Sequence, residues 1–186
     1  MFMLAAIACA VSLQAAQLDW SLAAKSFTKS DGTGYAYGQT TYLLTFASSA
    51  AADTLYTQLK NGDKTTADAI ALAVGSAVGN TSSTKNQGKI AAATAINASL
   101  AEGSTYYAAL LVVDGDKFIM SSTQSGIAYN PTGTVETEGS AAAFTASNFS
   151  TTAESRTGWT TAAPEPTSGI LMLVGLGALA LRRRRA

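Results

Sequence analysis

The sequence predicts a mainly β protein: a single β-sandwich-like domain with one or two short helices, followed by a C-terminal single transmembrane helix. Three observations lead to this prediction. Short runs rich in β-branched and aromatic residues recur between Gly, Asn and Asp turn signals. One segment of the first half changes from the two-residue period of a strand to the period of a helix. The chain ends in an uncharged apolar run followed by four arginines.

Residues 1–16 are expected to be a secretory signal peptide, because an apolar segment is followed by the small residues Ala15 and Ala16. No lysine or arginine precedes the apolar part, so only the α-amino group supplies positive charge there. A lipoprotein signal at Cys9 is the alternative, but its apolar segment would be too short. Cleavage after Ala15 or Ala16 removes the only cysteine in the sequence, so the mature chain has no disulfide.

The extracytoplasmic domain is expected to span residues 17–161, with strands wherever alternating or β-rich runs lie between turn residues. In chain order the predicted strands are 18–22, a strand beginning at 35–37, 41–47, 89–96, 105–113, 117–121, 126–129 and 141–145. The composition of 41–47 is that of a central strand. The segment 126–129 is expected at an edge, 141–145 is expected to close the sheet, and Trp159 is a candidate last contact with the core.

Two segments have helical features. Leu55, Tyr56 and Leu59 recur at helical spacing before Asn61-Gly62, which predicts a short helix over one end of the core. Thr65 to Asp68 then has the spacing of a capping box. The residues after it fit a strand by their alternation and a helix by their alanines, and we favour a short helix.

Asp114-Gly115-Asp116 separates two apolar runs, which is a strong hairpin signal. Calcium binding by Asp114 and Asp116 is the alternative, since oxygen ligands suit that ion. No third or fourth ligand lies in the same loop, so a plain turn is favoured and no metal site is predicted.

The C-terminal segment, residues 162–186, combines a stalk, an apolar helix and a basic end. Pro164 and Pro166 cannot continue a helix and hold the stalk extended around Glu165. The predicted transmembrane helix, 168–181, is shorter than the roughly 20 residues that a bilayer normally needs. The cluster Arg182, Arg183, Arg184 and Arg185 is expected on the cytoplasmic side, beside anionic lipid. These features fit both a plain tail anchor and a processed signal.

Pro164-Glu165-Pro166, the short apolar helix and the terminal arginines, taken together, resemble the PEP-CTERM sorting signal of Gram-negative, biofilm-forming bacteria. The resemblance implies recognition by an exosortase-type membrane transpeptidase, a transient stay in the bacterial inner membrane, and delivery to the cell surface or extracellular matrix. It covers the last part of the chain alone and leaves the domain unassigned.

The charge and the residue types of the domain exclude several classes of function. Residues 17–163 carry eight positive and eleven negative side chains, a net charge of −3, and show no basic stripe, so a nucleic-acid partner is not expected. The sequence has no histidine, which removes Ser-His-Asp and Cys-His catalysis and histidine-dependent zinc sites. A carboxylate pair is the remaining enzymatic route, but the carboxylates are scattered. We expect no enzyme, no catalytic residue and no cofactor.

The function expected is therefore that of a non-enzymatic surface or matrix protein. The alternative is a carbohydrate-binding or adhesion module on a plain tail anchor, with exopolysaccharide as its candidate partner. Six tyrosines are the candidate surface for such binding, although half-buried sheet positions are the favoured interpretation. They are Tyr35, Tyr37, Tyr42, Tyr106, Tyr107 and Tyr129.

Overall fold

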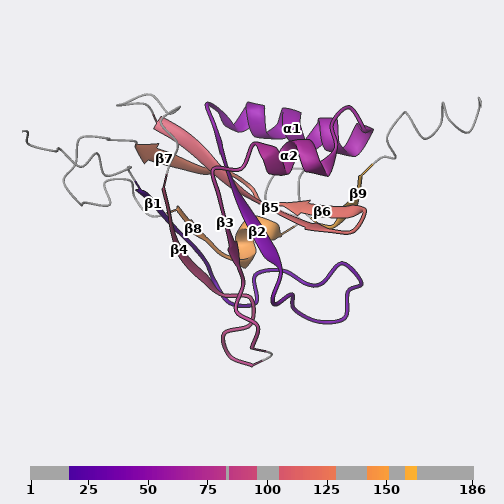
Figure 1. Cartoon of the computed structure of the whole chain (residues 1–186), viewed down its shortest axis with the longest axis vertical. Helices are drawn as coiled ribbons and strands as arrows, with labels where there is room; N and C mark the ends of the chain where they lie inside the picture. Colours follow the sequence, from indigo (N-terminus) through magenta and orange to yellow (C-terminus); the bar gives the residue numbers. More distant parts are fainter. Residues whose placement is uncertain (1–16, 83, 96–104, 129–141, 151–157, 163–186) are drawn as a thin grey trace, which may run out of the picture.

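The computed structural model describes residues 17–82, 84–95, 105–128, 142–150 and 158–162. This part of the chain is mainly β, with two sheets and two α-helices (Figure 1). The predicted signal peptide, 1–16, and the predicted transmembrane helix, 168–181, lie outside the described residues. Among the residues that are described, no helix has the length and apolar character needed to cross a membrane.

The larger sheet has six strands in the described part of the chain, and every neighbouring pair is antiparallel. Its main order is β3-β2-β5-β6-β9, and β7 also pairs with β5. The strands are β2 (Thr40–Phe46), β3 (Gly75–Val78), β5 (Thr105–Asp114), β6 (Lys117–Met120), β7 (Gln124–Ala128) and β9 (Thr160–Thr161). Because β2 lies between β3 and β5, the prediction of a central strand over 41–47 is confirmed.

The smaller sheet, as far as it is described, has the order β4-β1-β8. Its strands are β1 (Gln17–Leu22), β4 (Ile90–Ala95) and β8 (Ala142–Phe144). Strand β1 runs antiparallel to β4 and parallel to β8. The buried side chains of Trp20 and Leu22 alternate along β1 with the half-buried Ser21, so one face of this sheet points into a core.

Helix α1 (Ser49–Asn61) begins at Ser48, whose side chain accepts a hydrogen bond from the amide of Ala51, and ends at Gly62 in the left-handed region. Helix α2 (Thr66–Ala71) begins with the predicted capping box, in which Thr65 and Asp68 bond reciprocally. The predicted helical stripe is also confirmed, because the four buried residues of α1 share one face. They are Ala52, Leu55, Tyr56 and Leu59.

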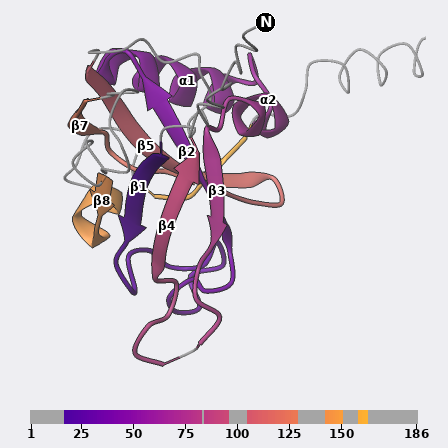
Figure 2. The ribbon, with the colours of Figure 1, turned by 60° about the vertical axis from the view of Figure 1, so that its left-hand side comes forward.

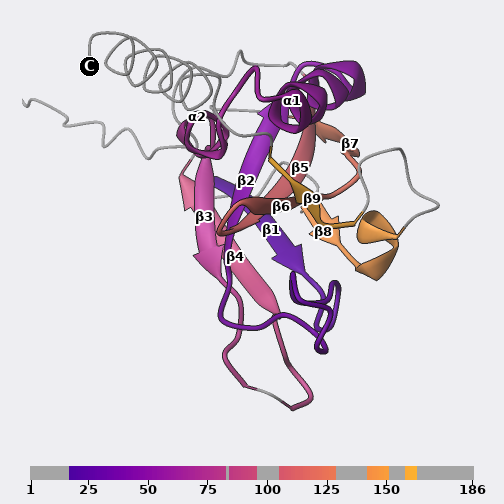
Figure 3. The same cartoon turned by 90° about the vertical axis from the view of Figure 1, so that its right-hand side faces the viewer.

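The larger sheet is the middle of three layers, with the helices on one face and the smaller sheet on the other (Figures 2 and 3). Alternation along β5 produces this arrangement: Leu110 packs in the core shared with the smaller sheet, and Leu111 packs in the core under the helices. The helices thus cover a sheet face, whereas the sequence suggested one end of the core. The prediction of a mainly β domain with one or two short helices is confirmed, and the described residues form two sheets, the larger of which carries both helices on one face.

One other prediction needs correction, the favoured helix after Thr65 is confirmed but shorter than the ambiguous stretch, and one strand was missed. Residues 35–37 begin no strand, and Tyr35 makes an isolated bridge with Thr28, because left-handed glycines on both sides, Gly34 and Gly38, turn the chain too sharply for a ladder. The ambiguous stretch after Thr65 holds both alternatives in succession, helix α2 and then strand β3. Strand β9 was not predicted, because its two threonines carry no apolar alternation.

Candidate functional site: the exit of the C-terminal segment

The predicted sorting residues Pro164, Glu165 and Pro166 and the cluster Arg182–Arg185 lie outside the described residues. The structure does describe residues 158–162, which lead into them and are called the exit segment below. The attachments of this segment show which elements hold the chain immediately before the predicted sorting residues.

The exit segment adds a short strand to the edge of the larger sheet. Strand β9 pairs antiparallel with β6, with Thr160 opposite Phe118 and Thr161 opposite Lys117. One residue later the amide of Ala162 donates a hydrogen bond of 2.8 Å to the carbonyl of Asp116, in the turn between β5 and β6. Backbone bonding therefore extends to the last described residue, at the β5–β6 turn (Figure 3).

Trp159 attaches the start of the exit segment to the first long loop. Its indole Nε1–H donates a hydrogen bond of 2.7 Å to the carbonyl of Thr28. Its ring meets Phe27 edge-on with 6.2 Å between centroids, and Phe27 in turn packs on Phe149 at 5.0 Å. The prediction that Trp159 is a late core contact is confirmed, because it packs against the core between the two sheets.

Tyr56 attaches the middle of the exit segment to helix α1. Its hydroxyl shares a hydrogen bond of 2.9 Å with Oγ1 of Thr160, across 104 residues of sequence. The side chain is 8% exposed, and its ring lies edge-on to Phe118 with 5.6 Å between centroids. The sequence predicted Tyr56 as a core residue of the helix but gave no signal for its polar partner. Helix, sheet and exit segment thus meet at this tyrosine.

Replacing Tyr56 by Phe is expected to lower the free energy of unfolding by about 1 kcal/mol, because one partly buried hydrogen bond is lost while the ring stays packed. Thr160→Val removes the same bond from the other side. In a double-mutant cycle, urea denaturation of the full chain in detergent micelles should give a coupling energy of about 1 kcal/mol. Strictly additive losses would contradict a stabilising bond between Tyr56 and Thr160.

The predicted hairpin at Asp114-Gly115-Asp116 is confirmed: β5 and β6 pair from Leu111 opposite Met120 to Asp114 opposite Lys117. The Asp114 carboxylate accepts a hydrogen bond from the Ser30 hydroxyl, and Lys117 Nζ donates one of 3.2 Å to the Ser30 carbonyl. These contacts join the hairpin to the first long loop. In the described part of the chain, no three acidic, histidine or cysteine side chains gather closely enough to hold a metal ion.

The candidate tyrosine surface does not form as one surface. Tyr42 packs with the core under the helices, and Tyr106 packs with the core on the opposite face of the larger sheet. Tyr35 and Tyr37 lie exposed on the loop between β1 and β2. Tyr107 is half-buried on β5, and Tyr129 lies outside the described residues. Among the six, Tyr35 and Tyr37 are the large exposed aromatics of the described region.

Two described carboxyl groups have a shifted pKa, and local hydrogen bonds cause both shifts. The side-chain hydroxyl of Thr33, followed by its amide, lowers the pKa of Asp31. The amide of Thr65, followed by its hydroxyl, lowers the pKa of Asp68. Both groups are exposed and serve a turn and a helix cap, so their environments are those of structural carboxylates.

Comparison with known families identifies the segment that follows this geometry. The family model of the PEP-CTERM protein-sorting motif matches residues 162–185. The match begins at Ala162, whose amide makes the last described backbone bond to the hairpin turn. No curated protein and no solved structure matches the chain. The resemblance found in the sequence is thereby confirmed, and it assigns the C-terminal segment alone.

Proposed function

We propose, from the PEP-CTERM motif at residues 162–185, that this chain is the precursor of a non-enzymatic protein of the cell surface or extracellular matrix. Residues 1–16 export it. The helix 168–181 and the four arginines hold it briefly in the inner membrane. An exosortase-type transpeptidase then processes the chain at Pro164–Pro166 and releases the domain from its hydrophobic tail.

The observation that carries this proposal is the PEP-CTERM motif itself, which begins directly after strand β9. Strand β9 ends at Thr161, and the motif begins at Ala162. A protease or transpeptidase binds an extended backbone, and Pro164 and Pro166 favour an extended backbone. Cleavage there leaves Trp159 and Tyr56 with their partners, so the domain keeps its contacts when the tail is removed.

The N-terminal end supports export in the same way. Among the described residues, strand β1 follows the predicted signal peptide and pairs with β4 from Gln17 opposite Ala95 to Leu22 opposite Ile90. A signal peptidase acting after Ala15 or Ala16 would therefore leave these described pairs in place.

A non-enzymatic role is supported by the side chains available. The sequence contains no histidine, and the carboxylates with shifted pKa values, Asp31 and Asp68, accept hydrogen bonds within the turn and the cap in which they lie. The Asp114 carboxylate is bonded to Ser30. These groups hold loops and helix ends in place, a structural use of carboxylates.

The proposal predicts that the mature protein from the native host lacks residues 170–186. Intact-mass analysis of the surface fraction should give one species, with the mass of a chain that starts near Gln17 and ends near Pro164–Pro166. A variant in which Pro164, Glu165 and Pro166 are all replaced by alanine should have the mass of a chain that still contains residues 170–186. It should also stay with the membrane fraction.

The matched control is Pro131→Ala, which changes a proline of the domain and should leave processing unaltered. A mature form that retains residues 170–186 in the wild-type chain would overturn processing and leave a plain tail anchor. Release of the tail from the triple-alanine chain would show that a different sequence is recognised.

A further inference from the structure

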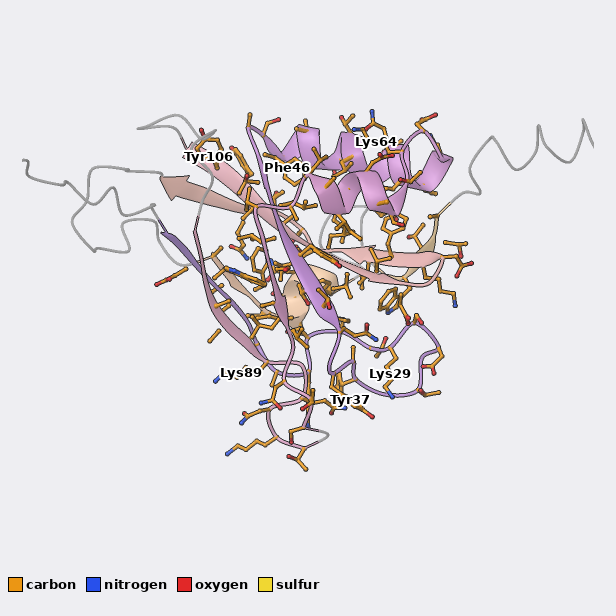
Figure 4. All side chains as sticks on the ribbon, in the orientation of Figure 1. Lys29, Tyr37, Phe46, Lys64, Lys89 and Tyr106 are labelled. Atoms are coloured by element: carbon orange, nitrogen blue, oxygen red, sulfur yellow. The ribbon has the colours of Figure 1, made fainter. Side chains whose placement is uncertain are left out.

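One end of the described molecule is built from two loops, residues 23–38 and residues 79–82 with 84–89, and is called the loop end below. Figure 4 places Lys29, Tyr37 and Lys89 at this end and Phe46, Lys64 and Tyr106 at the opposite end. The two loop sequences contain one acid, Asp31, against four lysines: Lys25, Lys29, Lys85 and Lys89. The β5–β6 turn, which is bonded to Ser30 of the first loop, adds Asp114, Asp116 and Lys117, so five lysines face three acids on a domain whose net charge is −3.

The two loops are bonded into one unit. The amide of Lys25 donates a hydrogen bond of 2.8 Å to the carbonyl of Gln87, and Gln87 Nε2 donates one of 3.1 Å to the carbonyl of Tyr35. Gly88 lies so close to Ala36 that an added Cβ would stand 2.6 Å from its carbonyl oxygen. The side chains on this end are therefore presented by a joined scaffold.

Two exposed aromatic rings lie among these lysines. Tyr35 is 44% exposed and Tyr37 is 37% exposed, whereas Tyr56 in the core is 8% exposed. Lys25 Nζ lies 5.8 Å from the ring centroid of Tyr35, and Lys29 Nζ lies 4.7 Å from that of Tyr37. Each exposed ring thus has an ammonium group over one of its faces.

We propose that the loop end binds an acidic polysaccharide, a polymer of uronic acid residues. The apolar face of a pyranose ring packs on an exposed aromatic ring, and its carboxylate pairs with an adjacent ammonium group. The pairs Lys25–Tyr35 and Lys29–Tyr37 repeat this combination on neighbouring stretches of one loop. The Asp31 carboxylate is occupied by the amide and hydroxyl of Thr33, at 2.8 and 2.7 Å.

Two other anionic partners fit less well. A nucleic acid requires a continuous basic stripe, whereas the surrounding domain is acidic. For the membrane-held precursor an anionic membrane surface fits less well, because the exit segment runs from Trp159, bonded to Thr28 of the loop end, to Ala162 beside the core under the helices. The comparison with a membrane surface rests on the proposed function, in which the membrane-held segment follows residue 162. Polysaccharide binding itself is measured independently of tail processing.

The test uses the full chain in neutral detergent micelles and polygalacturonate as the probe, with biolayer interferometry as the readout. The double variant Lys25→Gln/Lys29→Gln should weaken binding about tenfold, and Tyr35→Ala/Tyr37→Ala should weaken it by a similar factor. Raising the salt from 50 to 300 mM should weaken wild-type binding, because Lys25 is exposed and Lys29 is half-buried, and salt screens charges near the surface over about 8 Å at physiological ionic strength. The charge-matched control Lys60→Gln/Lys64→Gln, at the opposite end, should bind like the wild type.

Lys25→Arg/Lys29→Arg should keep the affinity, and each variant should unfold within a few degrees of the wild type. Equal losses in the Lys60/Lys64 control would overturn the site, because net charge would then be sufficient. Equal binding of neutral dextran would overturn the acidic ligand. Tighter binding to single-stranded DNA or to phosphatidylglycerol vesicles than to polygalacturonate would overturn the ligand class.

Discussion

Phe118→Ala is expected to lower the free energy of unfolding by about 3–5 kcal/mol, which would leave a domain of ordinary stability close to unfolding. Phe118 has no exposed surface and packs in the core between the larger sheet and the helices. Its ring meets Tyr56 edge-on, and its backbone pairs with Thr160. Removing the ring opens a cavity under α1, beside the exit segment. Urea denaturation monitored by tryptophan fluorescence measures the loss.

Ile119→Ala is the matched control, because Ile119 is buried in the core on the other face of the same strand. It should cost about 2–5 kcal/mol but leave the contacts of Tyr56 in place. Hydrogen exchange at the amide of Ala162 separates the two variants. We expect exchange through local opening in Phe118→Ala and through global unfolding alone in Ile119→Ala. The same exchange behaviour in both would contradict a role for Phe118 in holding the exit segment.

The parts of the fold that the sequence predicted are those in which local chemistry and tertiary packing agree. Leu55, Tyr56 and Leu59 lie on the buried face of a helix whose caps are also in the sequence, and all three predictions were confirmed. The β5–β6 hairpin follows from a turn signal between two apolar runs. In both cases the decisive residues are within a few positions of one another.

Non-local pairings were not predictable in this way. The parallel pairing of β1 with β8 joins Trp20 to Ala142, and β9 exists because an edge of β6 is available to Thr160 and Thr161. Nothing near Thr160 in the sequence indicates Tyr56 as its partner. The sorting motif was predictable because its chemistry lies in one contiguous segment, whereas the manner in which the domain holds that segment depends on three distant elements.

Gly88→Ala is expected to lower the free energy of unfolding by about 2–4 kcal/mol, through two separable effects. Its φ is +73°, where a side chain other than that of glycine is strained by about 1–2 kcal/mol. The new Cβ would also stand 2.6 Å from the carbonyl oxygen of Ala36, so the backbone of one loop must shift. Gly32→Ala is the matched control, because its φ is +75° and nothing lies within 4 Å of its added Cβ.

The difference between these two variants isolates the contact between the loops. Gly32→Ala should cost about 1–2 kcal/mol and keep the two loops joined. Gly88→Ala should cost more, and it should also weaken polygalacturonate binding, because shifting Ala36 moves the neighbouring rings of Tyr35 and Tyr37 relative to the second loop. Denaturation and binding measured on the same preparations test both statements. Equal destabilisation by the two variants would show that the close approach of Gly88 to Ala36 is relieved without cost. Full binding by a destabilised Gly88→Ala chain would show that the two tyrosines act without support from the second loop.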